Sequence, residues 1–248
     1  MNVSLAAITF VPGLALGSFL NVVAARVPLK RSIVRPGSAC MSCGRELGWS
    51  ENIPVISYVA LRGRCGGCRT SIGVVYPAVE LLTAILIAAC FLVFGLSGEA
   101  FVASFFCAVL VTVSATDMSH RIIPNVIVLP AAAIVLAAQT ALEPSPEWAL
   151  AALGAFLFLF IAAFAYPAGM GMGDVKFALL LGAMLGRTVP VALMVGMIAA
   201  LVPSIFLIAR HGKAARKMGI PFGPFLAIGG LVALFAGDRL LDAYLQLI

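Results

Sequence analysis

Two aspartates have the residue type and spacing that best suit chemistry. Asp117 and Asp174 stand at the ends of otherwise uncharged apolar stretches, and Asp174 closes the segment Gly171-Met172-Gly173-Asp174. An ionisable side chain at the edge of the hydrocarbon is costly to keep there, so it is a functional candidate by default. Gly171 and Gly173 allow the backbone to unwind and another chain to approach closely.

Two close carboxylates in a low-dielectric niche can hydrolyse an amide. They cannot both ionise easily, so they share a proton and differ in role. One takes a proton from water, while the other polarises the scissile carbonyl, and the pair then donates a proton to the leaving nitrogen. Helix-end dipoles assign the base to Asp174 and the acid to Asp117, unless Arg121 pairs with Asp117 and reverses the roles. The alternative is that both aspartates only cap helix ends at the water interface.

Four cysteines form two CxxC pairs, and their spacing is typical of a tetrahedral zinc site. The pairs are Cys40 with Cys43 and Cys65 with Cys68, separated by 21 residues. The alternative is two disulfides or a redox pair, which a reducing cytosol disfavours.

Glycines adjoin these pairs, and the two remaining cysteines lie in apolar spans. We expect Gly44, Gly66 and Gly67 to supply the conformational freedom that zinc knuckles need. Cys90 and Cys107 are expected to be buried small hydrophobes.

The elements that position these residues follow from an apolar composition. The 248 residues are 62% hydrophobic and 10% charged, with a mean hydropathy of +1.12, far from soluble domains. Since about 20 apolar residues cross a bilayer as a helix, we predict an all-α polytopic membrane protein with about eight transmembrane helices. They are expected at about 4–25, 75–94, 100–117, 122–141, 149–168, 175–187, 189–209 and 222–245. The sixth is short because Gly186, Arg187 and Pro190 interrupt it, which also fits a re-entrant segment.

Three parts follow from this pattern: a first transmembrane helix at 1–26, a cytoplasmic zinc-binding loop domain at 27–73, and a membrane-embedded peptidase domain at 74–248. The first helix lacks a positively charged start and a clear small-residue cleavage site, so we expect it to be retained rather than removed as a signal peptide.

The distribution of positive charge predicts the orientation. With the N-terminus outside, fourteen of the sixteen Lys and Arg residues, including Lys213, Arg216 and Lys217, lie on the inner side, and only Arg187 and Arg239 lie outside. The cysteine loop and both aspartates are then cytoplasmic. The net charge of +6 reflects this topology and contact with anionic lipid, and gives no case for nucleic acid.

Several short motifs occur in order along nearly the whole chain. They are GSFLNV at 17–22, the two CxxC pairs flanking NIP at 52–54, YPAVE at 76–80, Asp117 followed by HRIIPN at 120–125, GMGDVK at 171–176 and PFGP at 221–224. As an ordered set they strongly resemble the type IV prepilin peptidase family, also called leader peptidases. The GxGD motif alone is less specific, since presenilin-like intramembrane proteases share it.

The resemblance implies a bacterial inner-membrane aspartic endopeptidase of the GxGD type. Family members remove the basic leader of type IV prepilins or pseudopilins after a glycine at the cytoplasmic face, and Asp117 and Asp174 match the catalytic positions. Members with the cysteine loop also methylate the new N-terminal amine with S-adenosylmethionine, so this cofactor is implied here. The sequence shows no strand-linked glycine fingerprint for it, so no cofactor-binding residue is assigned.

Three further polar residues belong to these motifs. Asn21 and Glu80, near inner helix ends, are candidates for contacting substrate or methyl donor, or for hydrogen bonding between helices. Lys176 points away from Asp174 on a regular helix, towards lipid phosphate or water. Two other functions fit parts of the pattern: a thiol oxidoreductase using the CxxC pairs, and a transporter whose aspartates carry protons.

Overall fold

The structure, a computed structural model, describes residues 2–166, 169–212 and 219–246. Lys213, Arg216 and Lys217, part of the predicted cytoplasmic charge, lie outside this range. Within it the chain is helical, and seven helical segments are long and apolar enough to cross a membrane. The predicted all-α, multi-pass membrane fold is confirmed.

Eight long helices correspond to the eight predicted apolar segments. They are α1 (Asn2–Arg26), α3 (Val75–Phe94), α4 (Gly98–His120), α5 (Asn125–Leu142), α6 (Glu147–Ala165), α7 (Met172–Leu185), α8 (Val189–His211) and α9 (Gly223–Leu245). The sixth segment differs from a full span, because α7 has 14 residues. At 1.5 Å per residue it is about 21 Å long, less than a hydrocarbon core of about 30 Å. A 3-10 turn, η2 (Gly186–Thr188), separates α7 from α8, and Met172–Arg210 together forms one of the seven candidate spans.

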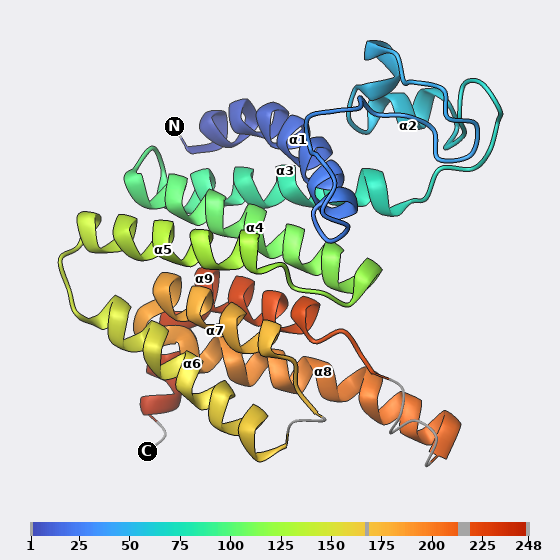
Figure 1. The fold of residues 1–248 in the computed structure, drawn as a ribbon. Helices are drawn as coiled ribbons and strands as arrows, with labels where there is room; N and C mark the ends of the chain where they lie inside the picture. The colour runs from blue at the N-terminus through green and yellow to red at the C-terminus, as the bar shows by residue number, and fades with distance from the viewer. Residues whose placement is uncertain (1, 167–168, 213–218, 247–248) are drawn as a thin grey trace. The chain divides into compact units, whose positions relative to one another are not determined.

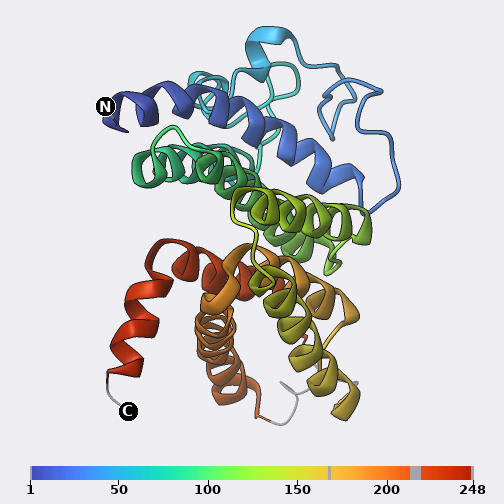
Figure 2. The same cartoon turned by 90° about the vertical axis from the view of Figure 1, so that its left-hand side faces the viewer.

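The chain divides into two units, residues 1–115 and 116–248. In the first unit α1 packs along α3 (Figures 1 and 2). Two glycines one turn apart make this possible: a Cβ on Gly13 would lie 2.7 Å from Ala84 Cα, and one on Gly17 would lie 2.6 Å from Glu80 Cα. Small residues at this spacing let two membrane helices approach closely.

The first 18 residues of α4 pack in the same unit. Phe91 of α3 and Phe101 of α4 meet edge to face, with ring centroids 5.2 Å apart. Cys90 and Cys107 are fully buried, and their sulfurs lie 3.7 Å apart. Both are free thiols, as expected for small buried hydrophobes.

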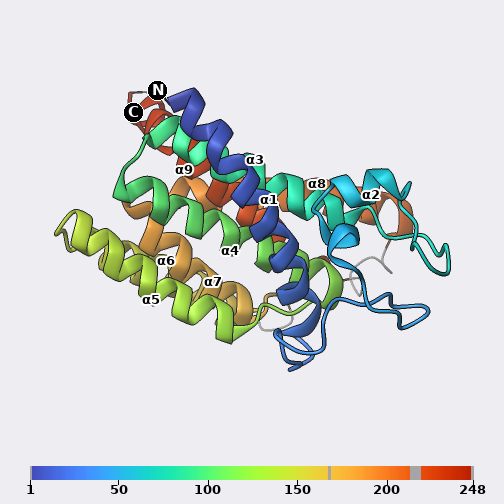
Figure 3. The ribbon, with the colours of Figure 1, turned by 90° about the horizontal axis from the view of Figure 1, so that it is seen from above.

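The segment between α1 and α3 forms a loop region with two short helical turns, η1 (Trp49–Asn52) and α2 (Ile56–Ala60). Viewed from above, it lies beyond the C-terminal end of α1 and beside the start of α3 (Figure 3). Its regular structure is limited, among the described residues, to these turns and two isolated β-bridges, Ala39 with Glu46 and Arg64 with Ser71.

In the second unit α7 is the central helix, packed against α5 and α6, while α8 pairs with α9. Nine of its fourteen residues are buried. Close packing with α6 requires Gly182, because a Cβ there would overlap Ala152 of α6. Gln139 of α5 is also buried, and its Nε2 donates a hydrogen bond of 3.2 Å to the carbonyl of Met184. A short central helix is thus held firmly by its neighbours.

Candidate active site and metal site

Asp117 lies in the last turn of α4 with 6% of its surface exposed. The backbone N–H of Gly223, the first residue of α9, donates a hydrogen bond of 2.8 Å to Asp117 Oδ2. A Cβ on residue 223 would lie 2.9 Å from that oxygen, so only glycine allows the approach. The start of α9 therefore fixes one oxygen of this carboxylate.

Asp174 lies in the first turn of α7 and is partly buried. The backbone N–H of Gly171 donates to Asp174 Oδ2 over 3.2 Å, so this aspartate caps its own helix. The capping alternative raised by the sequence is therefore correct for Asp174 in geometry. Capping uses one carboxylate oxygen and leaves Oδ1 for other contacts.

The two carboxylates lie near enough for their charges to interact, although 57 positions separate them in the sequence. Gly173 contributes to this proximity, because a Cβ there would lie 3.0 Å from Ile123 Cβ, in the link that follows Asp117. Arg121 of the same link also interacts with Asp117 through its charge. The helix ends bring together the two aspartates that the sequence singled out, each with one oxygen held by a glycine N–H.

Lys176 has a specific partner near this site. We expected it to meet lipid phosphate or water, but its Nζ donates a hydrogen bond of 3.1 Å to Asn125 Oδ1. Asn125 is exposed and Lys176 is partly buried, and their hydrogen bond joins the second turn of α7 to the first residue of α5. Lys176 therefore positions the start of α7.

The four CxxC cysteines form a second site, in the first unit. Their sulfurs all lie within 4.8 Å of one another, and Cys40 Sγ and Cys68 Sγ are 3.7 Å apart. Zinc–sulfur bonds of about 2.3 Å place the corners of a tetrahedron about 3.8 Å apart, so the cluster fits zinc. The pair of Cys40 and Cys68 joins the two motifs, which favours a four-ligand site over two separate redox pairs.

Matching backbone turns present the sulfurs. In the first, the N–H of Cys40 bonds to the carbonyl of Arg45; in the second, that of Cys65 bonds to Thr70, both over 2.9 Å. The residue after each second cysteine has positive φ: 70° at Gly44 and 60° at Arg69.

Gly44 therefore has the predicted role, but Gly66 and Gly67 do not. A Cβ on Gly66 would overlap Glu51 Oε1, and one on Gly67 would lie 2.9 Å from Arg45 Nε, so the paired Arg45 and Glu51 side chains occupy the space that a side chain would need.

The electrostatics of the thiols are uneven. The hydroxyl and backbone N–H of Thr70 lower the pKa of Cys68 to about 6, because they stabilise its thiolate. The backbone hydrogen bond from Arg45 acts to lower the pKa of Cys43, but the neighbouring Cys40 and Cys68 thiols outweigh it and raise that pKa to about 11. The pKa values of Cys68 and Cys43 are thus shifted in opposite directions. A bound dication would hold both side chains as thiolates, because thiols that coordinate a metal are deprotonated.

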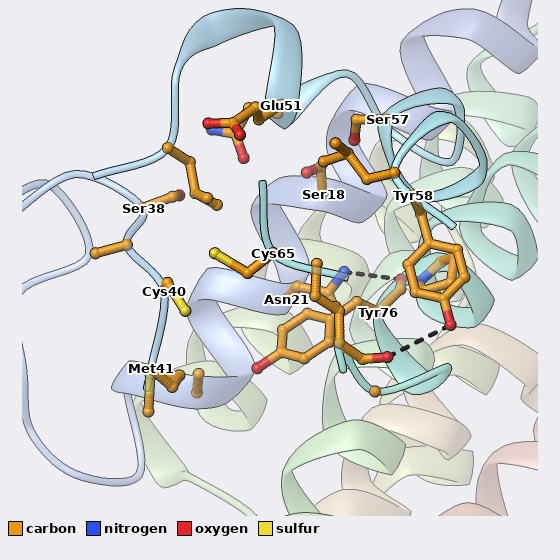
Figure 4. Close-up of a pocket in the computed structure, with 18 of the residues that line it drawn as sticks. Ser18, Asn21, Ser38, Cys40, Met41, Glu51, Ser57, Tyr58, Cys65 and Tyr76 are labelled. Carbon is orange, nitrogen blue, oxygen red and sulfur yellow. Dashed lines mark hydrogen bonds between the residues drawn. The ribbon is translucent and has the colours of Figure 1, made fainter. Parts of the chain in front are cut away.

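Asn21 and Glu80 lie in the first unit and make contacts between elements. Asn21 Nδ2 donates to the carbonyl of Tyr76 over 3.0 Å, which bears out the interhelical hydrogen bond weighed for it. Glu80 is 8% exposed, and its Oε2 accepts the N–H of Val55 over 2.7 Å. Both residues also line a cavity between α1, the loop region and α3, in which Figure 4 labels Asn21.

Sequence reasoning missed several of these partners. Gly223 was visible only as part of the PFGP motif, and nothing in the sequence indicated that its N–H meets Asp117. Asn125 carries a polar side chain at the start of a helix, which in the sequence indicates only some local hydrogen bond. The structure identifies its partner as Lys176. Tyr58, which also lines that cavity, had no signal beyond its place between the CxxC pairs.

Comparison with known proteins gives consistent matches. The profile of the Bacterial Peptidase A24 N-terminal domain matches residues 11–94, and that of the Type IV leader peptidase family matches residues 104–207. A prepilin leader peptidase/N-methyltransferase of Bacillus subtilis (strain 168) is 36% identical, over 97% of this chain and 98% of its own length. Proteins of the same name from Burkholderia pseudomallei (strain 1026b) and Pseudomonas aeruginosa are each 34% identical, over 93% and 96% of this chain and 85% and 92% of theirs. No solved structure matches.

Proposed function

The chain belongs to the type IV leader peptidase family, and we propose that it cleaves the leader from a prepilin with Asp117 and Asp174 and then methylates the new N-terminal amine. One observation carries the peptidase assignment: two carboxylates from the ends of different helices interact, each with Oδ2 fixed by a glycine N–H. The names of the three relatives support the second activity.

The geometry suits water-mediated peptide hydrolysis. Because Oδ2 of each aspartate is held in place, Oδ1 of each is the oxygen that handles water and protons. One Oδ1 takes a proton from water as the oxygen attacks the scissile carbonyl, while the other gives its proton to the carbonyl oxygen. The C–N bond then breaks as a proton passes to the leaving nitrogen. No covalent enzyme intermediate forms, and the pair returns to its shared-proton state.

The assignment of Asp174 as the base and Asp117 as the acid stays a prediction. Asp174 lies in the first turn of a helix, as that assignment requires, and the charge of Arg121 interacts with Asp117, as its reversal requires. Because the two carboxyl groups titrate as a coupled pair, the role of each aspartate has to be determined by titrating the variant that lacks the other.

The substrate class follows from the family and from charge. We propose cleavage after a glycine at the cytoplasmic face of a bacterial inner membrane, where a type IV prepilin or pseudopilin presents its basic leader. The proposed orientation has the N-terminus outside and the cysteine loop inside, because fourteen of sixteen cations then lie on the inner side. A C-terminal reporter fused after each link between helices tests this topology.

The proposed cofactors are one structural zinc ion and S-adenosylmethionine. The mutual spacing of the sulfurs of Cys40, Cys43, Cys65 and Cys68 supports zinc. It would hold together a loop region that has little regular structure of its own, as small metal-dependent domains require. Methylation needs a neutral amine aligned with the donor, so positioning supplies most of its rate.

The deciding experiment uses purified protein in lipid nanodiscs and a full-length prepilin. Wild type is expected to cleave the leader and, with S-adenosylmethionine, to add a methyl group to the new N-terminus, both read by mass spectrometry. Asp117→Asn and Asp174→Asn should each lower the rate of cleavage roughly 10²–10⁴-fold while retaining zinc. Asp238→Asn is the matched control, since Asp238 pairs with Arg187 outside the aspartate site. Normal cleavage by either active-site variant refutes the peptidase assignment.

A further inference from the structure

A cavity of about 430 Å³ lies within the first unit, between the C-terminal part of α1, the loop region and the start of α3 (Figure 4). Its volume is within the range of about 300–1,000 Å³ found for small-molecule sites. Cys40 and Cys65 of the candidate zinc site also line it, and it contains neither aspartate of the candidate peptidase site. Ser18 and Asn21 reach it from α1, Tyr58 from α2, and Tyr76 and Glu80 from α3.

Glu80 gives the cavity its charge character. The residue is 8% exposed, and its Oε2 accepts a hydrogen bond from the neutral N–H of Val55. Within the described residues of this unit, no Lys or Arg forms an ion pair with it. Burying a carboxylate without a cation costs free energy, so a positively charged ligand in this cavity would be stabilised by it.

The backbone held by Glu80 is strained. Val55 has φ 60° and ψ −47°, and the N–H of Ile56 reaches back to the carbonyl of Pro54 over 2.6 Å, which makes a tight γ-turn. This conformation is rare for a β-branched residue and persists only where surrounding contacts enforce it, most often at functional sites. Glu80 thus fixes the loop against α3 at the wall of the cavity.

Aromatic rings and one guanidinium complete the wall. The phenol rings of Tyr58 and Tyr76 come from different elements and both line the cavity (Figure 4). Such rings stack on nucleobases and attract cations through their faces. Arg26 is the basic residue among the lining side chains. Its Nη1 and Nη2 each donate one hydrogen bond, to the carbonyls of Ser32 and Gly37, and its remaining N–H groups suit a carboxylate.

We propose that this cavity binds the methyl donor, a sulfonium nucleoside that carries an amino-acid tail, with Glu80 as the carboxylate that favours its positive charge. The volume, the two aromatic rings, the buried carboxylate and the nearby guanidinium match the parts of that ligand class. A leader peptide of several residues is too large for this volume. This inference rests on the proposed methyltransferase function and deepens it.

The bound donor supplies a methyl group to the neutral amine: the nitrogen lone pair forms the new C–N bond, and the pair of the broken C–S bond stays on sulfur. The sulfonium becomes a neutral thioether, and the amine becomes a methylated ammonium. Glu80 therefore favours the donor over its product, because only the donor carries the sulfonium charge.

The test measures binding to the full chain in nanodiscs by equilibrium dialysis, with S-adenosylmethionine and its thioether product S-adenosylhomocysteine. Wild type is expected to bind the sulfonium more tightly than the thioether. Glu80→Gln should weaken sulfonium binding by about tenfold and remove the preference, because it deletes the charge but keeps the shape. Glu46→Gln, in the same loop region but outside the cavity, is the matched control and should leave both affinities unchanged.

A second variant keeps the proposal testable if Glu80→Gln fails to fold. Ser18→Phe fills the cavity from α1 and should abolish binding of both ligands while zinc content and melting temperature stay as in wild type. Ultraviolet cross-linking of labelled donor to the wild-type chain needs no variant at all. Label is expected on peptides that contain Tyr58 or Tyr76, and label confined to residues 116–248 would overturn the proposal.

The outcomes separate this inference from the proposed function. If wild type methylates a cleaved pilin but both cavity variants bind the donor normally, the cavity assignment is wrong and the methyltransferase stands. If wild type neither cleaves nor methylates, the proposed function fails. If wild type binds neither ligand, the cavity proposal fails whatever the peptidase does. Asp174→Asn should lose cleavage and keep donor binding.

Discussion

Replacing Gly223 with alanine tests whether a backbone N–H from α9 positions the carboxylate of Asp117, which we propose to be catalytic. The new Cβ would lie 2.9 Å from Asp117 Oδ2, whereas an ordinary contact begins at about 3.4 Å. The carboxylate must therefore move by about 0.5 Å or give up its 2.8 Å hydrogen bond. Alanine is the better helix former, so the change should not unfold α9.

The size of the effect follows from this displacement. Catalytic groups need positions held to about 0.5 Å, and a shift of about 1 Å can cost roughly 10²-fold in rate. We expect Gly223→Ala to lower the kcat of prepilin cleavage by about 10-fold to 100-fold, or about 1.4–2.7 kcal/mol in activation free energy. Melting temperature, zinc content and methylation of a pre-cleaved pilin should not change.

The assay is steady-state cleavage in nanodiscs, with Gly154→Ala as the control. Gly154 lies in α6, and a Cβ there meets nothing within 4 Å, so this variant should cleave at the wild-type rate. Cleavage by Gly223→Ala within twofold of wild type would refute the idea that the start of α9 holds Asp117. Equal losses in both variants would point to a general effect on the membrane helices.

Two further predictions concern the zinc site and the start of α7. Removing zinc with a chelator, or replacing Cys43 with serine, should expose the loop region to protease and weaken methyl-donor binding, while cleavage persists. Protease resistance that survives complete zinc removal would contradict the structural role. In a double-mutant cycle, Lys176→Met and Asn125→Ala should show a coupling energy of about 0.5–1 kcal/mol in kcat/KM for cleavage, the size expected of an exposed hydrogen bond. Additive effects would show that their contact does not position Asp174.

Much of the fold could be predicted because bilayer solvation constrains it strongly. Apolar length alone located every long helix, with boundaries mostly within a few residues of the observed ones. The short α7 was recognisable because Gly186 and Arg187 interrupt its run, but its central place in the second unit was not. That place depends on contacts such as Gly182 against α6 and Gln139 with Met184, which are tertiary.

The candidate sites show the same limit. CxxC spacing was enough to predict a four-sulfur cluster, because two short turns fix where the thiols point. It was not enough to explain Gly66 and Gly67, which lie against the paired side chains of Glu51 and Arg45. The prediction that Asp117 and Asp174 act as a pair followed from topology, whereas the N–H from Gly223 requires a helix that begins 106 positions after Asp117.

The cavity was beyond sequence reasoning altogether. Asn21 and Glu80 were candidates as single polar residues, but periodicity does not show that α1, α2 and α3 enclose a volume between them. The strained turn at Val55 is equally invisible, since a valine in a loop predicts no positive φ. These features emerge only when the loop folds back on the two helices.

The most direct test of the central claim is a double-mutant cycle on the aspartate pair. Rates of prepilin cleavage are measured for Asp117→Asn, Asp174→Asn and the double variant, with methylation of a pre-cleaved pilin as the internal control. If both groups act as one unit, each single change should cost roughly 10²–10⁴-fold and the double change little more, with methylation intact. Independent losses that multiply in the double variant, or cleavage that survives either single change, would contradict a shared-proton pair.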